Sequence, residues 1–245
     1  MILRRFIEHF RNQQWTAVAL DFVIVVVGVF VGLQVDNWNQ ERADSQREAF
    51  YLAALKNDFN TVIVELESDI AHYEEIANSM TLLIDQSRKA APDASLDVLN
   101  TAARQLIVME GTPIVSDTYS NLTGSGDLAI IKSQALKNRM SSFFGQAQVV
   151  RLVANTHEMQ LVDIFQRYII ENLDYTTMFL EERGFPFSAA VGSDRILKVL
   201  PTAEFRNVAA VKWDIVTDIR DVLLSALDEA HAVESLLAEE LDKKE

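Results

Sequence analysis

The feature of this sequence that most restricts its fold is an apolar run over residues 17–35, in which Asp21 is the one charged residue. An α-helix of these 19 residues is about 28 Å long at about 1.5 Å per residue, close to the hydrocarbon thickness of a bilayer. Trp15 and Trp38 flank the run, where aromatic side chains of membrane proteins meet the interface. No β-strand needs this length, so the run predicts a transmembrane helix over residues 15–38.

A cleaved signal peptide is the alternative for an apolar segment near an N-terminus. Its apolar core has about 7–15 residues and ends in a small-x-small cleavage site. The run here is longer, Asp21 interrupts its start, and residues 34–40 contain no such site. We therefore expect an anchor that is not cleaved.

The charges beside the run predict its orientation. Residues 1–14 carry three arginines against Glu8, whereas residues 36–47 carry two arginines against three acidic residues. Because arginine-rich segments stay in the cytoplasm, we expect a short cytoplasmic arm over residues 1–14 and an extracytoplasmic domain over residues 39–245.

Three residues inside the span are candidates for helix pairing and anchoring. Gly28 and Gly32 form a small-xxx-small pair, which lets two membrane helices approach closely, although glycine is also common in membrane helices that do not pair. Asp21 lies about one turn inside the predicted cytoplasmic interface, where water or an arginine reaches it. We interpret it as a tolerated or structural carboxylate, with a proton-relay group as the alternative.

The composition restricts the domain that follows. The chain has 8 glycines and 4 prolines in 245 residues, which favours long helices over a turn-rich β-sandwich. Its net charge of −14 makes nucleic acid an unsuitable partner, because phosphate binding needs clustered lysines and arginines. The absence of cysteine excludes disulfides and thiolate metal sites.

Apolar residues recur every three or four positions in three long segments, which predicts three long amphipathic helices. The first covers residues 39–89 with a coiled-coil-like seam that includes Ile70. The second is capped by Ser133 and reaches Tyr168, and its seam includes His157 and Ile164. The third opens at Thr202 and reaches about Leu241, and its seam includes Val211. Shorter helices are expected over residues 95–109 and 116–126, and an irregular excursion over residues 174–201. Ser116 or Asp117 can cap the second short helix, and Gly126 is expected to end it in the αL conformation. The predicted fold is all-α: one transmembrane helix that continues into an elongated antiparallel helical bundle.

The block Leu33-Gln34-Val35-Asp36-Asn37-Trp38-Asn39-Gln40, preceded by Asp21 and Gly28, resembles the membrane boundary of a family of uncharacterised bacterial single-pass proteins. Their anchors are followed by the motif L-Q-x-N-N-W-N-E. Residues 122–132 and 204–207 are also similar to blocks of that family, with mild departures at positions 21, 36 and 40. The resemblance implies a single-pass protein of the bacterial inner membrane with a helical domain, and it implies no activity.

The sharpest chemical signal is a pair of Asp-x-x-His motifs, Asp69 with His72 and Asp228 with His231. A carboxylate and a histidine three residues apart share a helix face, and two such pairs in a bundle form half of a dimetal carboxylate site. That site ordinarily uses glutamates, and chance pairs are expected among 36 acidic residues and 4 histidines. We therefore treat the four residues as weak metal candidates and expect no cofactor and no catalytic residues.

The sequence leaves three alternative hypotheses for the function. The first is a non-enzymatic, membrane-anchored interaction module that self-associates or serves as an accessory subunit of an envelope membrane complex. The second is a ligand-sensing helical ectodomain, although residues 1–14 are too short for an output domain. The third is a metal-dependent enzyme, which requires the two Asp-x-x-His pairs to meet in one polar pocket.

Overall fold

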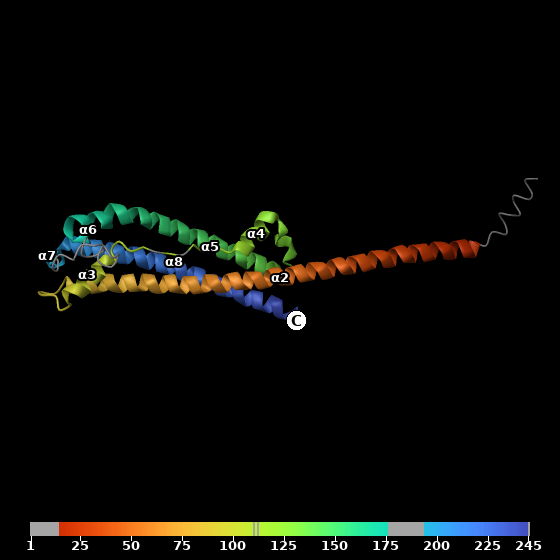
Figure 1. Cartoon of the computed structure of the whole chain (residues 1–245), viewed down its shortest axis with the longest axis horizontal. Coiled ribbons are helices and arrows are strands. Elements are labelled where there is room, and N and C mark those ends of the chain that lie inside the picture. Colours follow the sequence, from red (N-terminus) through yellow and green to blue (C-terminus); the bar gives the residue numbers. More distant parts are fainter. Residues whose placement is uncertain (1–14, 110, 112, 176–193, 245) are drawn as a thin grey trace, which may run out of the picture. The chain divides into compact units, whose positions relative to one another are not determined.

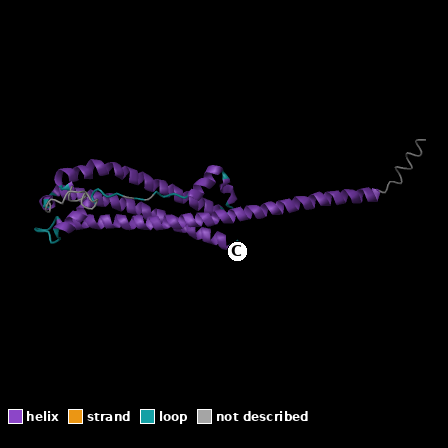
Figure 2. Ribbon diagram, in the orientation of Figure 1, coloured by secondary structure: helices purple, strands orange, loops and turns teal. Residues whose placement is uncertain are grey.

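The computed structural model describes residues 15–109, 111, 113–175 and 194–244, without the side chains of residues 15–19 and 21. Every regular element in these residues is a helix (Figures 1 and 2). The chain divides into two units, Met1–Phe50 and Tyr51–Glu245, and the division falls inside the helix α2 (Trp15–Gln86). The predicted all-α fold is confirmed.

In the first unit, α2 carries the apolar run. Its large apolar side chains from Leu20 to Val35 are all exposed, with none below 48%. By length and composition, this is the one helix among the described residues that is apolar enough to cross a membrane. The predicted domain boundary at residues 38 and 39 lies within the same continuous helix.

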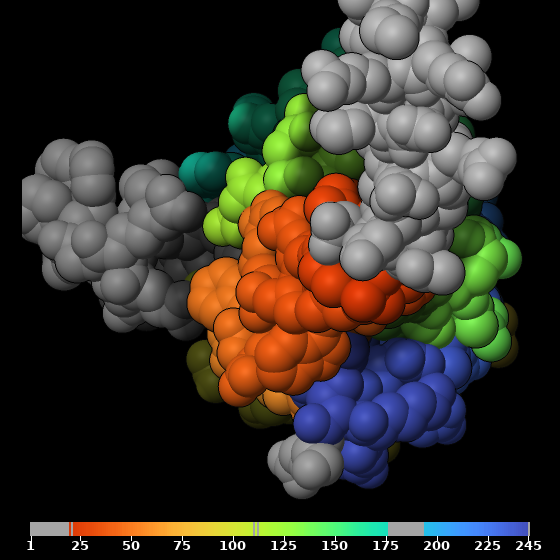
Figure 3. All heavy atoms as spheres, turned by 90° about the vertical axis from the view of Figure 1, so that its right-hand side faces the viewer, coloured from red at the N-terminus to blue at the C-terminus, as the bar shows by residue number. Residues whose placement is uncertain are grey.

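In the second unit, residues 51–86 of α2 pack with two other long helices, α5 (Gln134–Gln160) and α8 (Ala203–Asp242). Lys56 of α2 pairs with Glu234 of α8, and Arg139 of α5 pairs with Glu229 of α8. Figures 1 and 3 show α8 beside α2, and Figure 1 shows that α8 runs in the direction opposite to both other helices. The three helices form an antiparallel bundle.

The core follows a seam along each long helix. On α2, nine buried apolar positions follow steps of three and four, with one step of seven from Leu66 to Tyr73, which is the spacing of a coiled-coil seam: Leu52, Leu55, Phe59, Val62, Leu66, Tyr73, Ile76, Met80 and Leu83. Ala77, beside Ile76, is buried as well. Of the residues predicted for this seam, Ile70 is the exception, because it is half-buried. The regular spacing passes instead through Asp69, which is also half-buried.

On α8 the predicted seam is wrong near its start. Val211 was expected inside but is 41% exposed, whereas Lys212 is fully buried. Buried side chains recur in steps of four and three along α8, and Ile215 and Thr217, beside Val216, are buried as well. The positions in this spacing are Phe205, Ala209, Lys212, Val216, Ile219, Leu223, Ala226, Ala230, Val233 and Leu237. A lysine therefore occupies a core position of this heptad pattern.

The second long helix also departs from its prediction. A π-helix, η2 (Leu161–Gln166), follows α5 and continues into α6 (Arg167–Asn172). Because π-type hydrogen bonds accommodate one extra residue in the turn, the inward face moves by one position. Phe165 is buried, and Ile164, expected on the seam, is 38% exposed.

The shorter elements are set by local capping. Ser116 caps α4 (Asp117–Ser125) by accepting from the backbone N–H of Tyr119, and Gly126 ends it at φ 80°. The carboxylate of Asp58, on α2, accepts from the Ser116 hydroxyl at 2.7 Å and from the Thr118 N–H at 3.0 Å. This contact fixes α4 to the bundle.

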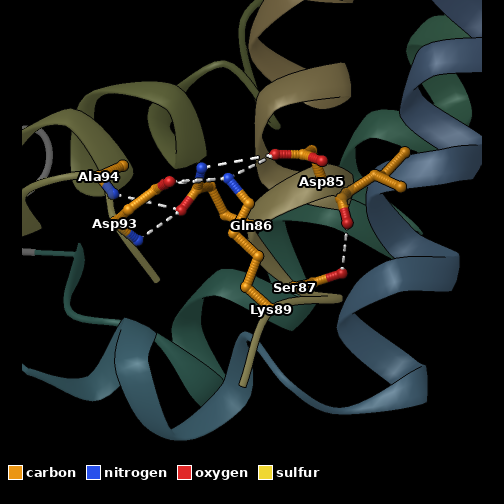
Figure 4. A network of polar contacts seen from close by, with 7 residues as sticks. Asp85, Gln86, Ser87, Lys89, Asp93 and Ala94 are labelled. Atoms are coloured by element: carbon orange, nitrogen blue, oxygen red, sulfur yellow. Dashed lines mark hydrogen bonds and ion pairs between the residues drawn. The ribbon is translucent and has the colours of Figure 1, made fainter. Parts of the chain in front are cut away.

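The end of α2 is closed by a polar network (Figure 4). The side-chain oxygen of Gln86 accepts from the backbone N–H groups of Asp93 and Ala94, and Lys89 pairs with Asp85 and Asp93 at 3.0 Å. These contacts satisfy a buried amide and fold the chain back, so α2 ends at Gln86 rather than at residue 89.

Two other predicted boundaries are corrected. The helix α3 (Leu96–Arg104) is shorter than the expected 95–109. The segment 174–201, expected to be irregular, contains the short helix α7 (Arg195–Val199), and its residues 176–193 lie outside the described residues.

Candidate functional site

The residues predicted to anchor the chain all lie on α2. The side chains of Trp15 and Asp21 are not among those that the structure describes. Trp38 is 60% exposed, and the guanidinium of Arg42 lies 6.0 Å from its ring centroid. This distance is at the limit of about 6 Å for a cation–π contact.

Gly28 and Gly32 lie one turn apart on the same face of α2. A Cβ atom added at either glycine meets no described atom within 4 Å. The surface over both glycines is therefore open within one copy of the chain. A larger side chain at either position fits the isolated helix.

The four metal candidates do not form one site. Asp228 and His231 are exposed on α8, whereas Asp69 and His72 are half-buried on α2. Since Lys56 lies opposite Glu234, Asp228 falls near the level of residue 62, about 10 Å along the axis from Asp69. Among the described residues, no three histidine, aspartate or glutamate side chains are placed to hold a metal ion.

His72 is half-buried on α2 and has a buried ring nitrogen. Its Nε2 atom is buried without a hydrogen-bond partner among the described residues, and its ring centroid lies 5.9 Å from that of Tyr73.

His157, which the sequence places on the α5 seam, joins α5 to α8. Its Nε2 lies 3.1 Å from the carboxylate of Asp218, and its Nδ1 lies 3.0 Å from Gln160.

The second unit contains a cavity of about 880 Å³. It lies among α2, the chain before α4, and the helices α4, α5 and α8. Its size is within the range of about 300–1,000 Å³ that small-molecule sites occupy. Arg151, Asn155 and Glu158 of α5 line it and are exposed, so the cavity opens to solvent along α5.

Most of the lining is apolar or aromatic. Val150, Leu161, Ile219 and Leu223 contribute aliphatic surface. At one end, the rings of Tyr119 and Phe144 stack with centroids 4.1 Å apart and an interplanar angle of 11°. The cavity therefore combines an apolar wall with a flat aromatic surface, which is the usual character of a small-molecule site.

Asp69 and Tyr73 supply the polar groups of the α2 wall. A Cβ atom at Gly111 would lie 3.7 Å from the Asp69 carboxylate oxygen Oδ2 and 3.7 Å from the Tyr73 hydroxyl. The two groups therefore converge on one point of the cavity wall, and both make further interactions within the chain. Asp69, one of the four metal candidates, thus lines this cavity.

Lys212 forms a second unusual site, which the sequence analysis missed. Its ammonium donates to the backbone carbonyl of Val108 at 2.7 Å and lies 5.3 Å from the ring centroid of Phe165. Burial lowers the pKa of Lys212 from 10.5 to about 7. The π-helix turns Phe165 toward this lysine. The strict seam spacing of α8 was the signal in the sequence.

The chain matches no protein-family model, and neither a curated protein nor a solved structure is significantly similar to it. The resemblance of residues 33–40 to a bacterial single-pass family therefore stays a prediction from the sequence. Functional roles in this chain depend on the geometry of its own residues.

Proposed function

We propose that the chain is a membrane-anchored helical module without a catalytic role, which associates with copies of itself or with other envelope membrane proteins. The observation that carries the proposal is the continuity of α2. One helix holds the exposed apolar stretch from Leu20 to Val35 and also the seam of the bundle from Leu52 to Leu83. No loop separates the predicted anchor from the domain.

The proposed location is the bacterial inner membrane, with residues 1–14 in the cytoplasm and the bundle outside it. The support is the arginine placement around the apolar run and the resemblance of the boundary block at residues 33–40. The lipid bilayer is then one partner of the chain. Self-association has Gly28 and Gly32 as its proposed contact, because small residues let two helix backbones approach closely.

The test is the oligomeric state of the full-length chain in native-lipid particles, by crosslinking or single-molecule counting. We expect Gly28→Ile combined with Gly32→Ile to weaken association without abolishing it, since such contacts contribute about 1 kcal/mol each. The matched control is Val26→Ile combined with Phe30→Ile, on the opposite face of the same turns. Because the space over both glycines is open, the glycine variants do not disturb the fold of one copy.

Unchanged oligomers in the glycine variant would show that the glycines only line lipid. A monomeric wild type would remove self-association and leave association with other envelope proteins.

The second candidate function is a ligand-sensing helical domain. The specific observation that favours it is the cavity of about 880 Å³ in the bundle, which opens to solvent beside α5. Two of its walls, α2 and α8, are long helices of the bundle, and a ligand that contacts both would change their packing. This candidate requires a ligand that the cavity binds selectively.

A further inference from the structure

We infer that the outer face of α5 pairs with the same face of a second copy of the chain, as a short parallel coiled coil. The residues that meet, called here the outer seam, are Val149, Leu152, Thr156 and Met159. The inference rests on the proposed self-association of the anchored chain, to which it adds a contact in the second unit.

The outer seam is exposed in one copy of the chain. Leu152 and Met159 are each 68% exposed, and Val149 is 42% exposed. Buried residues of α5, such as Met140 and Val150, lie on nearly the opposite face, about 160° around the helix axis at about 3.6 residues per turn. The helix α5 therefore carries two apolar seams, of which the bundle covers one.

The spacing of the outer seam is that of a parallel two-stranded coiled coil. Its steps are three, four and three, which places the β-branched residues Val149 and Thr156 at a positions of a heptad. Leu152 and Met159 then occupy the d positions. β-Branched side chains at a with leucine at d favour two parallel strands. The Thr156 hydroxyl donates to the backbone carbonyl of Leu152 at 2.8 Å, so its polar group is satisfied within the helix.

The charges around the outer seam favour a second copy as the partner. In a parallel pair each residue lies near the same residue of the other copy, so a charge on this face would meet its like. Over residues 141–160, which the structure describes without a gap, the charged residues are Arg151 and Glu158, and both line the cavity. By contrast, the exposed residues of α8 include four aspartates: Asp214, Asp218, Asp221 and Asp228. In a chain with a net charge of −14, the outer face of α5 lets two copies meet without like-charge repulsion across the contact.

The outer seam is short, which determines where the pair forms. From Val149 to Met159 it is about 15 Å long at about 1.5 Å per residue, and the π-helix η2 interrupts the helical period directly after it. A stripe of this length and about 10 Å in width is far below the roughly 800 Å² per partner of a standard stable interface. We therefore expect pairing between copies anchored in one membrane, where the effective concentration is high, and not in dilute solution.

Disulfide crosslinking tests the pairing directly, because the chain contains no cysteine. The full-length variants Leu152→Cys and Met159→Cys are oxidised separately with copper phenanthroline in native-lipid particles. Arg151→Cys is the matched control, because residue 151 is exposed beside Leu152 but lines the cavity. All three side chains are exposed, so the substitutions do not disturb the fold of one copy. A disulfide needs Cα atoms within about 7 Å, which an in-register parallel pair provides, so we expect dimer yields about fivefold above the control.

The Met159→Cys variant also reports the direction of the pair. In an antiparallel pair of the same seam, Met159 lies opposite Val149 of the second copy, so the two Met159 residues are about 15 Å apart along the axis. A disulfide at Met159 therefore requires a parallel pair.

A charge in the seam tests the contact with the same readout. Leu152→Glu, added to the Met159→Cys variant, should lower its dimer yield about fivefold, because two like charges then meet across the pair. Ser235→Glu, at an exposed position of α8, is the control and should leave the dimer yield unchanged.

A dimer from Leu152→Cys without one from Met159→Cys would overturn the parallel arrangement. Equal yields from Arg151→Cys would show random collisions and overturn the pairing. An oligomeric wild type with no crosslink at either seam position would overturn the inference, leave association through the anchor, and assign the outer face of α5 to another partner or to solvent. Seam crosslinks that persist when Gly28→Ile and Gly32→Ile are added would support the inference and overturn the glycine contact. A monomeric wild type would overturn both.

Discussion

Replacement of Lys212 by methionine tests the most unusual core position of the bundle. Lys212 is fully buried, contacts the face of Phe165 and donates to one backbone carbonyl, that of Val108. Methionine has a similar length and no charge. The variant therefore removes a buried ammonium and leaves the carbonyl of Val108 without this donor.

The magnitude follows from the lowered pKa. Burial moves the pKa of Lys212 from 10.5 to about 7, so between these values the unfolded chain binds more protons than the folded chain. Stability then rises with pH in this window, and the cost is fully present below about pH 7. The full shift corresponds to about 5 kcal/mol, of which about 2 kcal/mol is recovered between about pH 7 and about pH 9. The Phe165 face favours the charged form, which makes these figures upper limits.

Loss of the donor to Val108 costs about 1–3 kcal/mol. Lys212→Met should therefore be more stable than the wild type by about 1–3 kcal/mol near pH 7 and about equal to it near pH 9. The assay is chemical denaturation of the full-length chain in nanodiscs at several pH values, followed by circular dichroism. The exposed Lys198→Met is the control and should keep the wild-type slope. A wild type and a Lys212→Met variant with the same slope between pH 7 and pH 9 would refute the reasoning.

Two further predictions concern the bundle. Asp58→Ala should destabilise it by about 1–3 kcal/mol, because the Ser116 hydroxyl and the Thr118 N–H lose their acceptor; a double-mutant cycle with Ser116→Ala should show coupling, and additive effects would contradict the contact. EDTA should leave the melting temperature of the bundle unchanged, because the two Asp-x-x-His pairs lie on separate parts of α2 and α8; a substantial decrease would reopen the metal interpretation.

The sequence predicted much of the fold because its information is local. Apolar spacing located the three long helices, and Ser116, Ser133 and Thr202 were recognisable caps, each of which accepts from a backbone N–H as expected. The αL conformation of Gly126 was likewise predicted and is present. Such features depend on neighbours within a few residues.

The errors arise where a residue has a burial that is unusual for its type or where the helix geometry is irregular. The predicted seam of α8 includes Val211, because a lysine side chain is ordinarily exposed. The buried position is Lys212. The α5 seam was continued to Ile164 because an α-helical period was assumed, and the π-helix moves the core position to Phe165. Lys212 and Phe165 contact each other, so both departures from the predicted seams occur at one place in the core.

The cavity was beyond sequence reasoning for a different reason. Its walls come from helices that are distant in the sequence, with more than 100 residues between α2 and α8, and no periodicity reports the space between them. Asp69 was singled out, but for its spacing from His72 along one helix rather than for what lies opposite it.

The central claim is that residues 15–38 anchor the chain and hold the helical bundle outside the cytoplasm. The most direct test fuses a reporter after Leu241, near the end of α8, in a bacterial host. Alkaline phosphatase, which is active only outside the cytoplasm, should be active there, and green fluorescent protein at the same position should stay dark. A bright fluorescent fusion with an inactive phosphatase fusion would contradict this topology.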